Sequence, residues 1–280
     1  MWERNFGERS FSPTRPLPFL KTLPLEQIHF ELLWEWTKGR CPVGIAMAQY
    51  FTYGEQEIAH LKARDKRLAE IIELIGPVRR EVVPDLFEAL IHAIVGQQIA
   101  TRAQQTIWAR MRAGLGAITP GVIRETSETG LQAFGLSFRK VGYMKAAAER
   151  VLSGEFDVEA LRTLPDDALC AELARLPGVG VWTAEMLMTF SLQRPDVISY
   201  GDLAIQRGLR MLYRHRRVDR KLFDKYRRRY APHATVASLY LWAVAGGAVP
   251  GLTDPAPKAT SKVASRSAPR RTTIRKSASE

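Results

Sequence analysis

The sequence has few cysteines: two among its 280 residues, Cys41 and Cys170. They form neither a CxxC pair nor a cluster with histidine, so we expect no disulfide framework and no zinc or iron–sulfur site. Long apolar runs are also absent, since no stretch reaches the roughly 18–20 residues of a membrane span. The N-terminus lacks the apolar core of a signal peptide. These absences exclude a disulfide-rich secreted protein and a membrane protein, and they favour a globular protein of a reducing cytoplasm.

Acidic residues are outnumbered, because 41 Lys and Arg stand against 29 Asp and Glu, a net charge of +12. Residues 251–280 hold seven basic and two acidic residues, so the rest of the chain is basic as well. A basic body favours a polyanionic partner, with nucleic acid first. An anionic membrane surface is the weaker alternative, because the basic residues have no matching apolar face.

The period-2 alternation of β-strands is nearly absent, and amphipathic segments with a helical period replace it. Residues 57–76 carry one apolar stripe that ends at Gly76-Pro77, which predicts a single long helix. Residues 84–98 begin with Pro84-Asp85 and are apolar on nearly all sides, which is typical of a buried central helix. We therefore predict an all-α fold.

Composition divides the chain into three parts. Residues 1–50 are aromatic and interrupted by prolines, and we assign this N-terminal segment no role. Residues 51–249 hold the amphipathic helices and form the predicted domain. Residues 250–280 contain almost no large apolar side chains, so we predict a disordered basic tail.

The stretch LPGVGVWTAEML, residues 176–187, joins two helical segments through two glycines one residue apart. Gly178 and Gly180 can adopt positive φ and lack a Cβ, so several backbone N–H groups can converge on one point. The helix that follows adds unpaired N–H groups and the positive end of its dipole. The pattern indicates an anion site suited to a phosphate, and a plain interhelical turn is the alternative.

Asp202 follows Gly201 and precedes the amphipathic segment LAIQRGLRMLY. This is the position of a helix N-cap, and capping alone would account for the residue. The same N–H groups and helix dipole also favour negative charge on the side chain. Beside a bound nucleotide, such a carboxylate can stabilise positive charge on the sugar or activate a water. Asp202 is therefore a candidate catalytic residue.

Three stretches in this order, FEALIHAIVGQQIATRAQQTIWARM, LPGVGVWTAEML and GDLAIQRGL, resemble the helix-hairpin-helix/Gly-Pro-Asp DNA glycosylase superfamily. Within it they are most similar to the DNA-3-methyladenine glycosylase II branch, and the resemblance covers roughly residues 54–248. It implies two helical subdomains with the active site in the cleft between them. It also implies a base excision repair enzyme that flips 3-methyladenine or 7-methylguanine out of DNA and hydrolyses the N-glycosidic bond, leaving an abasic site.

The resemblance assigns the contacts to the DNA backbone. The amides around Gly178 and Gly180, together with Thr183, would hold a DNA phosphate. A monovalent cation, K⁺ or Na⁺, would bind the carbonyls of the hairpin at residues 176–181, while the chemistry itself would need no metal and no cofactor. Basic residues of the stretch 214–221 would also grip phosphates without reading sequence.

The resemblance likewise assigns the catalytic residue and the base pocket. Asp202 would be the catalytic carboxylate. Trp182 occupies the position of the Schiff-base lysine of glycosylase/lyase members, so we expect no lyase activity, and its indole would stack on the flipped base. The pocket would be completed by Trp242, Met186 and Leu203. Core packing is the alternative for Trp182 and Trp242. Some relatives have tyrosines at the positions of Met186 and Leu203, so the pocket here would be less aromatic.

Gln98 matches the position of a residue that wedges into the gap left by the flipped nucleotide, with an ordinary polar residue at a helix end as the alternative. Residues 137–143 would touch the opposite side of the duplex, or form a solvated loop.

The expected partner is double-stranded DNA with damaged bases, bound by a monomer in the cytoplasm at the bacterial nucleoid. A glycosylase for deaminated or oxidised bases and a non-catalytic helix-hairpin-helix DNA-binding protein are the competing interpretations. The combination of Asp202, Trp182 and Trp242 argues against the second, because binding alone requires neither an acid nor an aromatic pocket.

Overall fold

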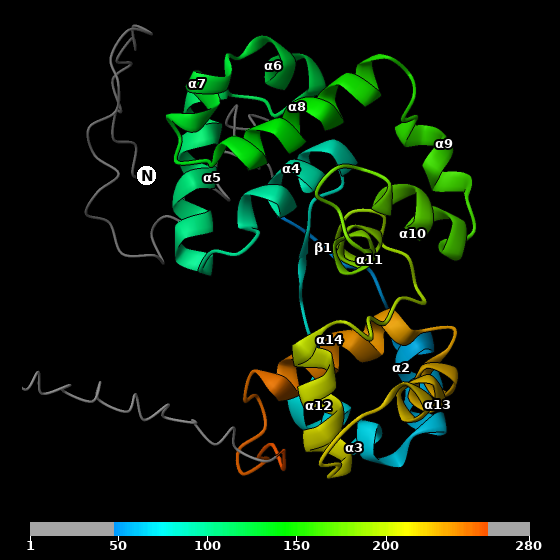
Figure 1. Cartoon of the computed structure of the whole chain (residues 1–280). Helices are drawn as coiled ribbons and strands as arrows, with labels where there is room; N and C mark the ends of the chain where they lie inside the picture. The colour runs from blue at the N-terminus through cyan, green and yellow to red at the C-terminus, as the bar shows by residue number, and fades with distance from the viewer. Residues whose placement is uncertain (1–47, 257–280) are drawn as a thin grey trace, which may run out of the picture. The chain divides into compact units, whose positions relative to one another are not determined.

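The computed structural model describes residues 48–256, and helices make up most of this range (Figure 1). The predicted helical class is therefore confirmed. Most of the predicted N-terminal segment and of the basic tail lies outside the described residues. In chain order the helices are α2 (Glu55–Arg64), α3 (Lys66–Ile75), α4 (Leu86–Gly96), α5 (Thr101–Leu115), α6 (Pro120–Glu125), α7 (Glu128–Gln132), α8 (Phe138–Leu152), α9 (Val158–Thr163), α10 (Asp166–Ala174), α11 (Val181–Phe190), α12 (Leu203–Tyr213), α13 (Arg220–Tyr230) and α14 (Ala234–Ala245).

Two very short strands depart from the all-α expectation. β1 (Gln49–Tyr50) pairs antiparallel with β2 (Glu81–Val82), so that Gln49 lies opposite Val82. Strands of two residues are too short to show an alternating pattern, and local sequence therefore does not predict them. Their pairing closes the segment that holds α2 and α3.

The long helix predicted over residues 57–76 is wrong: it is two helices that meet at Asp65. Asp65 adopts an extended conformation, ends α2 and caps α3 by accepting a hydrogen bond from Leu68 N at 3.0 Å. The same buried carboxylate accepts hydrogen bonds from Tyr213 Oη at 2.7 Å and from Arg229 Nη1 at 2.5 Å. Tyr213 and Arg229 are remote in sequence, so the apolar stripe alone could not reveal the break.

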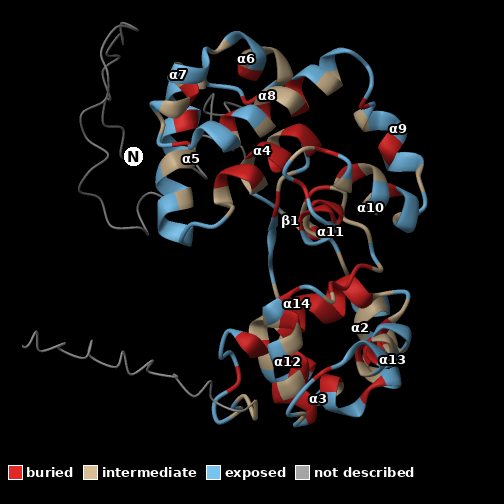
Figure 2. Cartoon of the chain, viewed as in Figure 1, coloured by how far each residue is buried: buried red, intermediate tan, exposed pale blue. Residues whose placement is uncertain are grey.

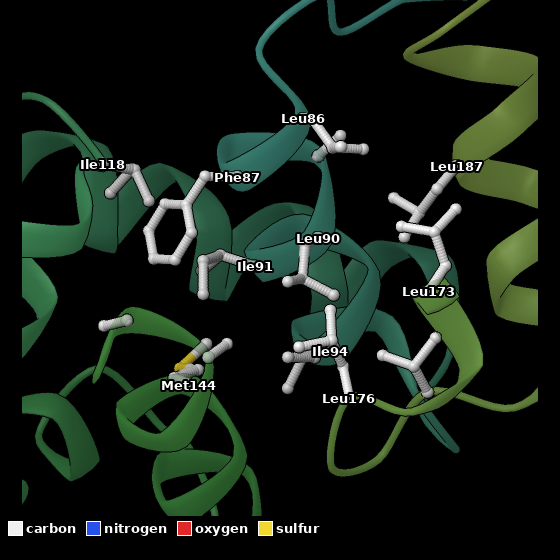
Figure 3. Packing of buried hydrophobic residues seen from close by; sticks show 14 of the residues in the cluster. Leu86, Phe87, Leu90, Ile91, Ile94, Ile118, Met144, Leu173, Leu176 and Leu187 are labelled. Atoms are coloured by element: carbon white, nitrogen blue, oxygen red, sulfur yellow. The ribbon is translucent and has the colours of Figure 1, made fainter. Parts of the chain in front are cut away.

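Buried apolar residues form two clusters in the described part of the chain. Figure 2 colours the buried positions red on the ribbon. The first collects residues from α4 to α11 and centres on α4, which confirms the central helix predicted for residues 84–98. In Figure 3, Leu90, Ile91 and Ile94 of this helix lie between Met144 of α8 and the leucines of α10 and α11. The second cluster collects residues of α2, α3, α12, α13 and α14.

The described chain runs past the predicted domain boundary at residue 250. Arg210 on α12 donates from Nε and Nη2 to the two carboxylate oxygens of Asp254, at 2.9 and 2.5 Å. This bidentate pair holds the pKa of the Asp254 carboxyl below its usual value. The low apolar content of residues 250–280 does not predict this ion pair, because Asp254 is held by an arginine that is remote in sequence.

Within residues 48–256, no helix has both the length and the apolar character required to cross a membrane.

Candidate active site

Asp202 is the N-cap of α12, as its place before the amphipathic segment predicts. Its Oδ1 accepts a hydrogen bond from Ile205 N at 2.8 Å, and the residue is only 7% exposed. Capping therefore explains one hydrogen bond of the carboxylate, the one from Ile205 N to Oδ1. The rest of its environment comes from two other helices.

Both tryptophans assigned to the base pocket donate their indole N–H groups to Asp202. Trp182 Nε1, at the start of α11, lies 2.9 Å from Oδ2, and Trp242 Nε1, on α14, lies 3.2 Å from Oδ1. Trp182 is 48% exposed, which argues against the alternative that it is a core residue. Trp242 is half-buried and packs against the Phe190 ring at 5.4 Å. The acid and the two aromatic side chains thus form one constellation, drawn from three helices.

Gly208 on α12 brings two of these helices together. It lies on the face of α12 that packs against α14. A Cβ at Gly208 would lie 2.4 Å from the backbone oxygen of Leu241, the residue before Trp242. Only a residue without a side chain permits this approach. An isolated glycine inside a helical pattern was the available signal for such packing.

The hairpin at residues 176–181 uses its two glycines differently from the expectation. Gly178 has φ of +80°, and a Cβ there would lie 2.3 Å from the Tyr143 ring, so the fold itself requires glycine at this position. Gly180 has an ordinary extended conformation, with φ of −93°, and a Cβ there would meet no atom within 4 Å. The expectation of positive φ is therefore correct for Gly178 alone.

Gly180 is the N-cap of α11 and contributes no side-chain cap. The first hydrogen bond of the helix runs from Ala184 N to Gly180 O, at 2.9 Å, so the N–H groups of residues 181–183 precede it. Thr183 is only 6% exposed, and its backbone N–H is one of these three groups. The geometry is that of a helix N-terminus with space for an anion above Gly180.

Gln98 lies beside this hairpin at the C-terminal end of α4. Its neighbour Gln97 donates from Nε2 to the Gly178 carbonyl at 2.7 Å, which fixes the end of α4 against the hairpin. Gln98 itself is exposed and has φ of +55°, a left-handed conformation that is uncommon outside glycine. Its side-chain oxygen accepts a hydrogen bond from Arg139 Nη2 of α8 at 3.4 Å. Its role as a wedge stays a prediction.

Leu203 and Met186 lie near the carboxylate along the chain. Leu203 follows Asp202 directly and is 80% exposed, while Met186 lies one helical turn after Trp182 and is half-buried. An exposed leucine next to a buried acid leaves an apolar surface at the site. A cavity of about 870 Å³ exists elsewhere, and it is lined by residues of β1, α2 and the segment around Pro77 and not by the predicted site residues.

The basic stretch 214–221 is divided by the structure. Arg214 ends α12, whose eleven residues place it about 16 Å from the end that carries Asp202. Arg220 instead begins α13 and lies over the Tyr200 ring, 5.3 Å from its centroid. Tyr200 precedes Asp202 by two residues. Through its contact with Tyr200, Arg220 is linked to the segment that carries Asp202.

The described residues contain no group of three or more His, Cys, Asp or Glu side chains placed to hold a metal ion. The hairpin carbonyls are a different kind of ligand. Gly178 O accepts from Gln97 Nε2, and Leu176 O accepts from Val179 N at 3.0 Å. A carbonyl oxygen has two lone pairs, so each retains one for a cation.

A hairpin that presents helix amides, followed by a helix capped by an aspartate in contact with two indoles, defines a class of DNA repair protein. The model of the HhH-GPD superfamily of base excision DNA repair proteins matches residues 91–232. The chain belongs to this superfamily.

Individual relatives agree with the family. The chain is 34% identical over 191 residues to DNA-3-methyladenine glycosylase 1 of Schizosaccharomyces pombe, covering 65% of this chain and 84% of that protein. The crystal structure of a DNA-3-methyladenine glycosidase from Bacillus halodurans is 36% identical with a TM-score of 0.65, covering 71% of this chain and 93% of that one. A 3-methyladenine DNA glycosylase of S. pombe in complex with abasic DNA is 30% identical with a TM-score of 0.60, covering 68% and 97%.

Proposed function

We propose that this protein is a monofunctional DNA glycosylase that releases alkylated purines, such as 3-methyladenine and 7-methylguanine, from double-stranded DNA. The observation that carries the proposal is the Asp202 carboxylate held by the indole N–H groups of Trp182 and Trp242. The relatives named as 3-methyladenine glycosylases support the substrate class.

The partners of Asp202 orient its carboxylate without neutralising it. Its three hydrogen-bond donors, Ile205 N and the two indoles, are all uncharged. A carboxylate offers about four lone-pair sites. Among residues 48–256, Oδ2 accepts from Trp182 alone, so this oxygen retains capacity toward a substrate. A negative charge oriented in advance stabilises a cationic transition state without reorganisation during the reaction.

The reaction that fits this site is hydrolysis of a weakened glycosidic bond. Alkylation at N3 or N7 gives the purine a positive charge, so the bond from C1′ of the sugar breaks readily and its electron pair returns to the base. Asp202 would stabilise the positive charge that develops on the sugar, in the manner of glycosidase carboxylates. Water then bonds to C1′ and releases a proton. Trp182, with its indole nearly half exposed, would stack on the flipped base.

The absence of lyase activity is part of this proposal. A lyase requires an amine that attacks the sugar and forms a Schiff base. The second position after the hairpin glycines holds Trp182, whose indole nitrogen is a donor and not a nucleophile. We therefore expect the reaction to stop at the abasic site.

Methylated duplex DNA tests the proposed function directly. The purified protein should release 3-methyladenine or 7-methylguanine, identified by chromatography, and strand breaks should appear only in the half of each sample treated with alkali. Breaks without alkali would contradict the monofunctional assignment. Binding of DNA without release of any base would contradict the enzyme, and release of deaminated or oxidised bases alone would contradict the substrate class.

The two hairpin glycines provide a matched pair of variants that separates folding from DNA binding. Gly178→Ala should destabilise the protein by about 1–2 kcal/mol, because the left-handed conformation is costly for alanine and the Tyr143 ring must move. Gly180→Ala should change stability by less than about 0.5 kcal/mol. Its Cβ would enter the open space above the helix amides, so duplex affinity should fall roughly tenfold through a weakened charged hydrogen bond.

Thermal melting and a DNA titration check both variants. For a domain of this size, the Gly178→Ala melting temperature should fall by about 2–8 °C. If Gly180→Ala binds duplex DNA as tightly as the parent protein, the phosphate is not at this position.

We further propose a monovalent cation on the hairpin carbonyls, consistent with the lone pairs that Leu176 and Gly178 retain. It would steady the hairpin beside the phosphate. The protein would act as a monomer on cytoplasmic chromosomal DNA.

A further inference from the structure

The turn that carries Gln98 has a conformation that its own sequence does not favour. Gln98 has φ of +55°, in the left-handed region, which is costly for a residue with a Cβ. Chains that leave a helix through this conformation usually use glycine for it. Here the glycine, Gly96, is the last residue of α4 and lies two positions earlier. The conformation of Gln98 therefore depends on contacts from outside the turn.

Gln104, the fourth residue of α5, makes such contacts with the end of α4. Its Nε2 donates to the His92 carbonyl at 3.1 Å and lies 3.3 Å from His92 Nε2. The same amide covers Gly96, where a Cβ would lie 2.4 Å from Gln104 Nε2. The Gln98 turn connects α4 to α5, so these contacts join the two helix ends that flank it.

His92 is suited to accept from this amide. It is half-buried, and its ring lies edge-on to the Trp108 ring of α5 with 4.8 Å between centroids. Burial lowers the pKa of the His92 imidazole, so the ring is neutral at pH 7 and has one acceptor nitrogen. The Gln104 amide nitrogen can only donate, and its two hydrogens serve His92 Nε2 and the His92 carbonyl together.

Other hydrogen bonds hold the end of α4 from different directions. Gln97 Nε2 donates to the Gly178 carbonyl at 2.7 Å, and Lys140 Nζ of α8 donates to the Val95 carbonyl at 2.7 Å. Neither of these bonds reaches α5. The contacts of Gln104 do, so they restrain the spacing of the two helix ends that the Gln98 turn must span.

We propose that Gln104 is a positioning residue for Gln98. By joining α4 to α5, it holds the turn in the conformation from which the Gln98 side chain fills the gap left by the flipped nucleotide. The inference rests on the proposed function, and on the wedge role predicted for Gln98. Gln104 itself would contact neither the DNA nor the reacting atoms.

The test compares the affinity of the full-length chain for two duplexes of equal length. One is intact, and the other carries a stable abasic-site analogue, so it offers the gap that the wedge would fill. Gln104→Met keeps a long side chain against Gly96 and removes both hydrogen bonds to His92. It should lower the preference for the abasic duplex by about five- to tenfold, the effect of losing about one net hydrogen bond.

Gln105→Met is the matched control, because Gln105 is the exposed neighbour of Gln104 on the same helix. It should leave the preference for the abasic duplex unchanged. Gly96→Ala is a second route to the same break, because its Cβ would displace the Gln104 amide, which is the flexible end of a side chain. It should reproduce the loss seen with Gln104→Met. Thermal melting establishes that each variant is folded at the temperature of the titrations.

A double-mutant cycle separates positioning from a merely structural role. Gln98→Ala removes the wedge and should lower the preference for the abasic duplex at least as far as Gln104→Met does. If Gln104 acts through Gln98, adding Gln104→Met to Gln98→Ala should lower it no further. A residue that only stabilises the fold would cause the same loss in both backgrounds.

Equal losses in the two backgrounds would overturn the proposal, and so would an unchanged preference with Gln104→Met or with Gln98→Ala. A parent chain that binds both duplexes equally would also overturn it. Binding of the abasic analogue requires no base release. A parent that prefers the abasic duplex but releases no base would therefore refute the proposed function, while the comparison of Gln104 and Gln98 variants would still decide the positioning role.

Discussion

Replacement of Asp202 by asparagine should reduce base release by at least about a hundredfold, the usual effect of removing one oriented group that stabilises a transition state. Asparagine is as good an N-cap as aspartate, so the hydrogen bond to Ile205 N can remain. The variant loses the negative charge that would face the sugar cation. It also turns an amide group toward an indole donor, since only one of its two terminal atoms is an acceptor.

The expected pattern is lost chemistry in a protein that folds and binds DNA. Single-turnover release of methylated bases measures the chemistry. The melting temperature measures folding, and the affinity for duplex DNA measures binding. Trp182 is the indole expected to lose its partner, and its half-exposed position allows water to replace it. Base release at the parental rate would show that Asp202 is not catalytic. If the variant loses its folded structure together with its activity, the role of Asp202 is that of a helix cap.

Replacement of Gly208 by alanine should damage both stability and activity, although Gly208 has no contact with DNA in our proposal. The added Cβ would lie 2.4 Å from the Leu241 backbone oxygen, and a backbone atom cannot turn aside as a side-chain end can. Restoring an ordinary contact of about 3.5 Å requires α12 and α14 to separate by about 1 Å. Overpacking of this kind costs about 1–3 kcal/mol.

The same separation moves Asp202, on α12, relative to Trp242, on α14. Misplacement of a catalytic group by about 1 Å can cost about a hundredfold in rate. We therefore expect the rate of base release to fall by up to this amount at a temperature where the variant is still folded. The measurement is single-turnover release well below the melting temperature.

Gly142→Ala is the matched control, because Gly142 lies inside α8, has no positive φ, and a Cβ there would meet no atom within 4 Å. Alanine there should stabilise the helix by up to about 1 kcal/mol through its better propensity. If Gly208→Ala melts and reacts like the parent, the close approach of α12 and α14 does not position the site.

Short-range features of this protein could be predicted from its sequence. The helical period identified the fold class and the buried central helix. The capping position of Asp202 depends on residues three apart, and the glycine hairpin is continuous in sequence. The order of these motifs was enough for the resemblance to a glycosylase family, which the family comparison then confirmed.

Features that depend on remote residues could not be predicted in this way. The break at Asp65 depends on Tyr213 and Arg229, more than a hundred residues away. The apolar stripe continues across the break, so its period gives no warning. The need for glycine at Gly178 but not at Gly180 depends in part on the Tyr143 ring, which belongs to another helix.

Local sequence was sufficient to show that this chain is helical, that Asp202 caps a helix and that two glycines precede Trp182, because each depends on neighbours within a few residues. The packing of separate helices was needed to show that Trp182 and Trp242 both bind the Asp202 carboxylate. These residues lie 20 and 40 positions from Asp202, and packing at Gly208 brings α12 and α14 together. Periodicity assigns a residue to a face of its own helix, whereas a hydrogen bond of 2.9 Å between helices depends on how their faces pack.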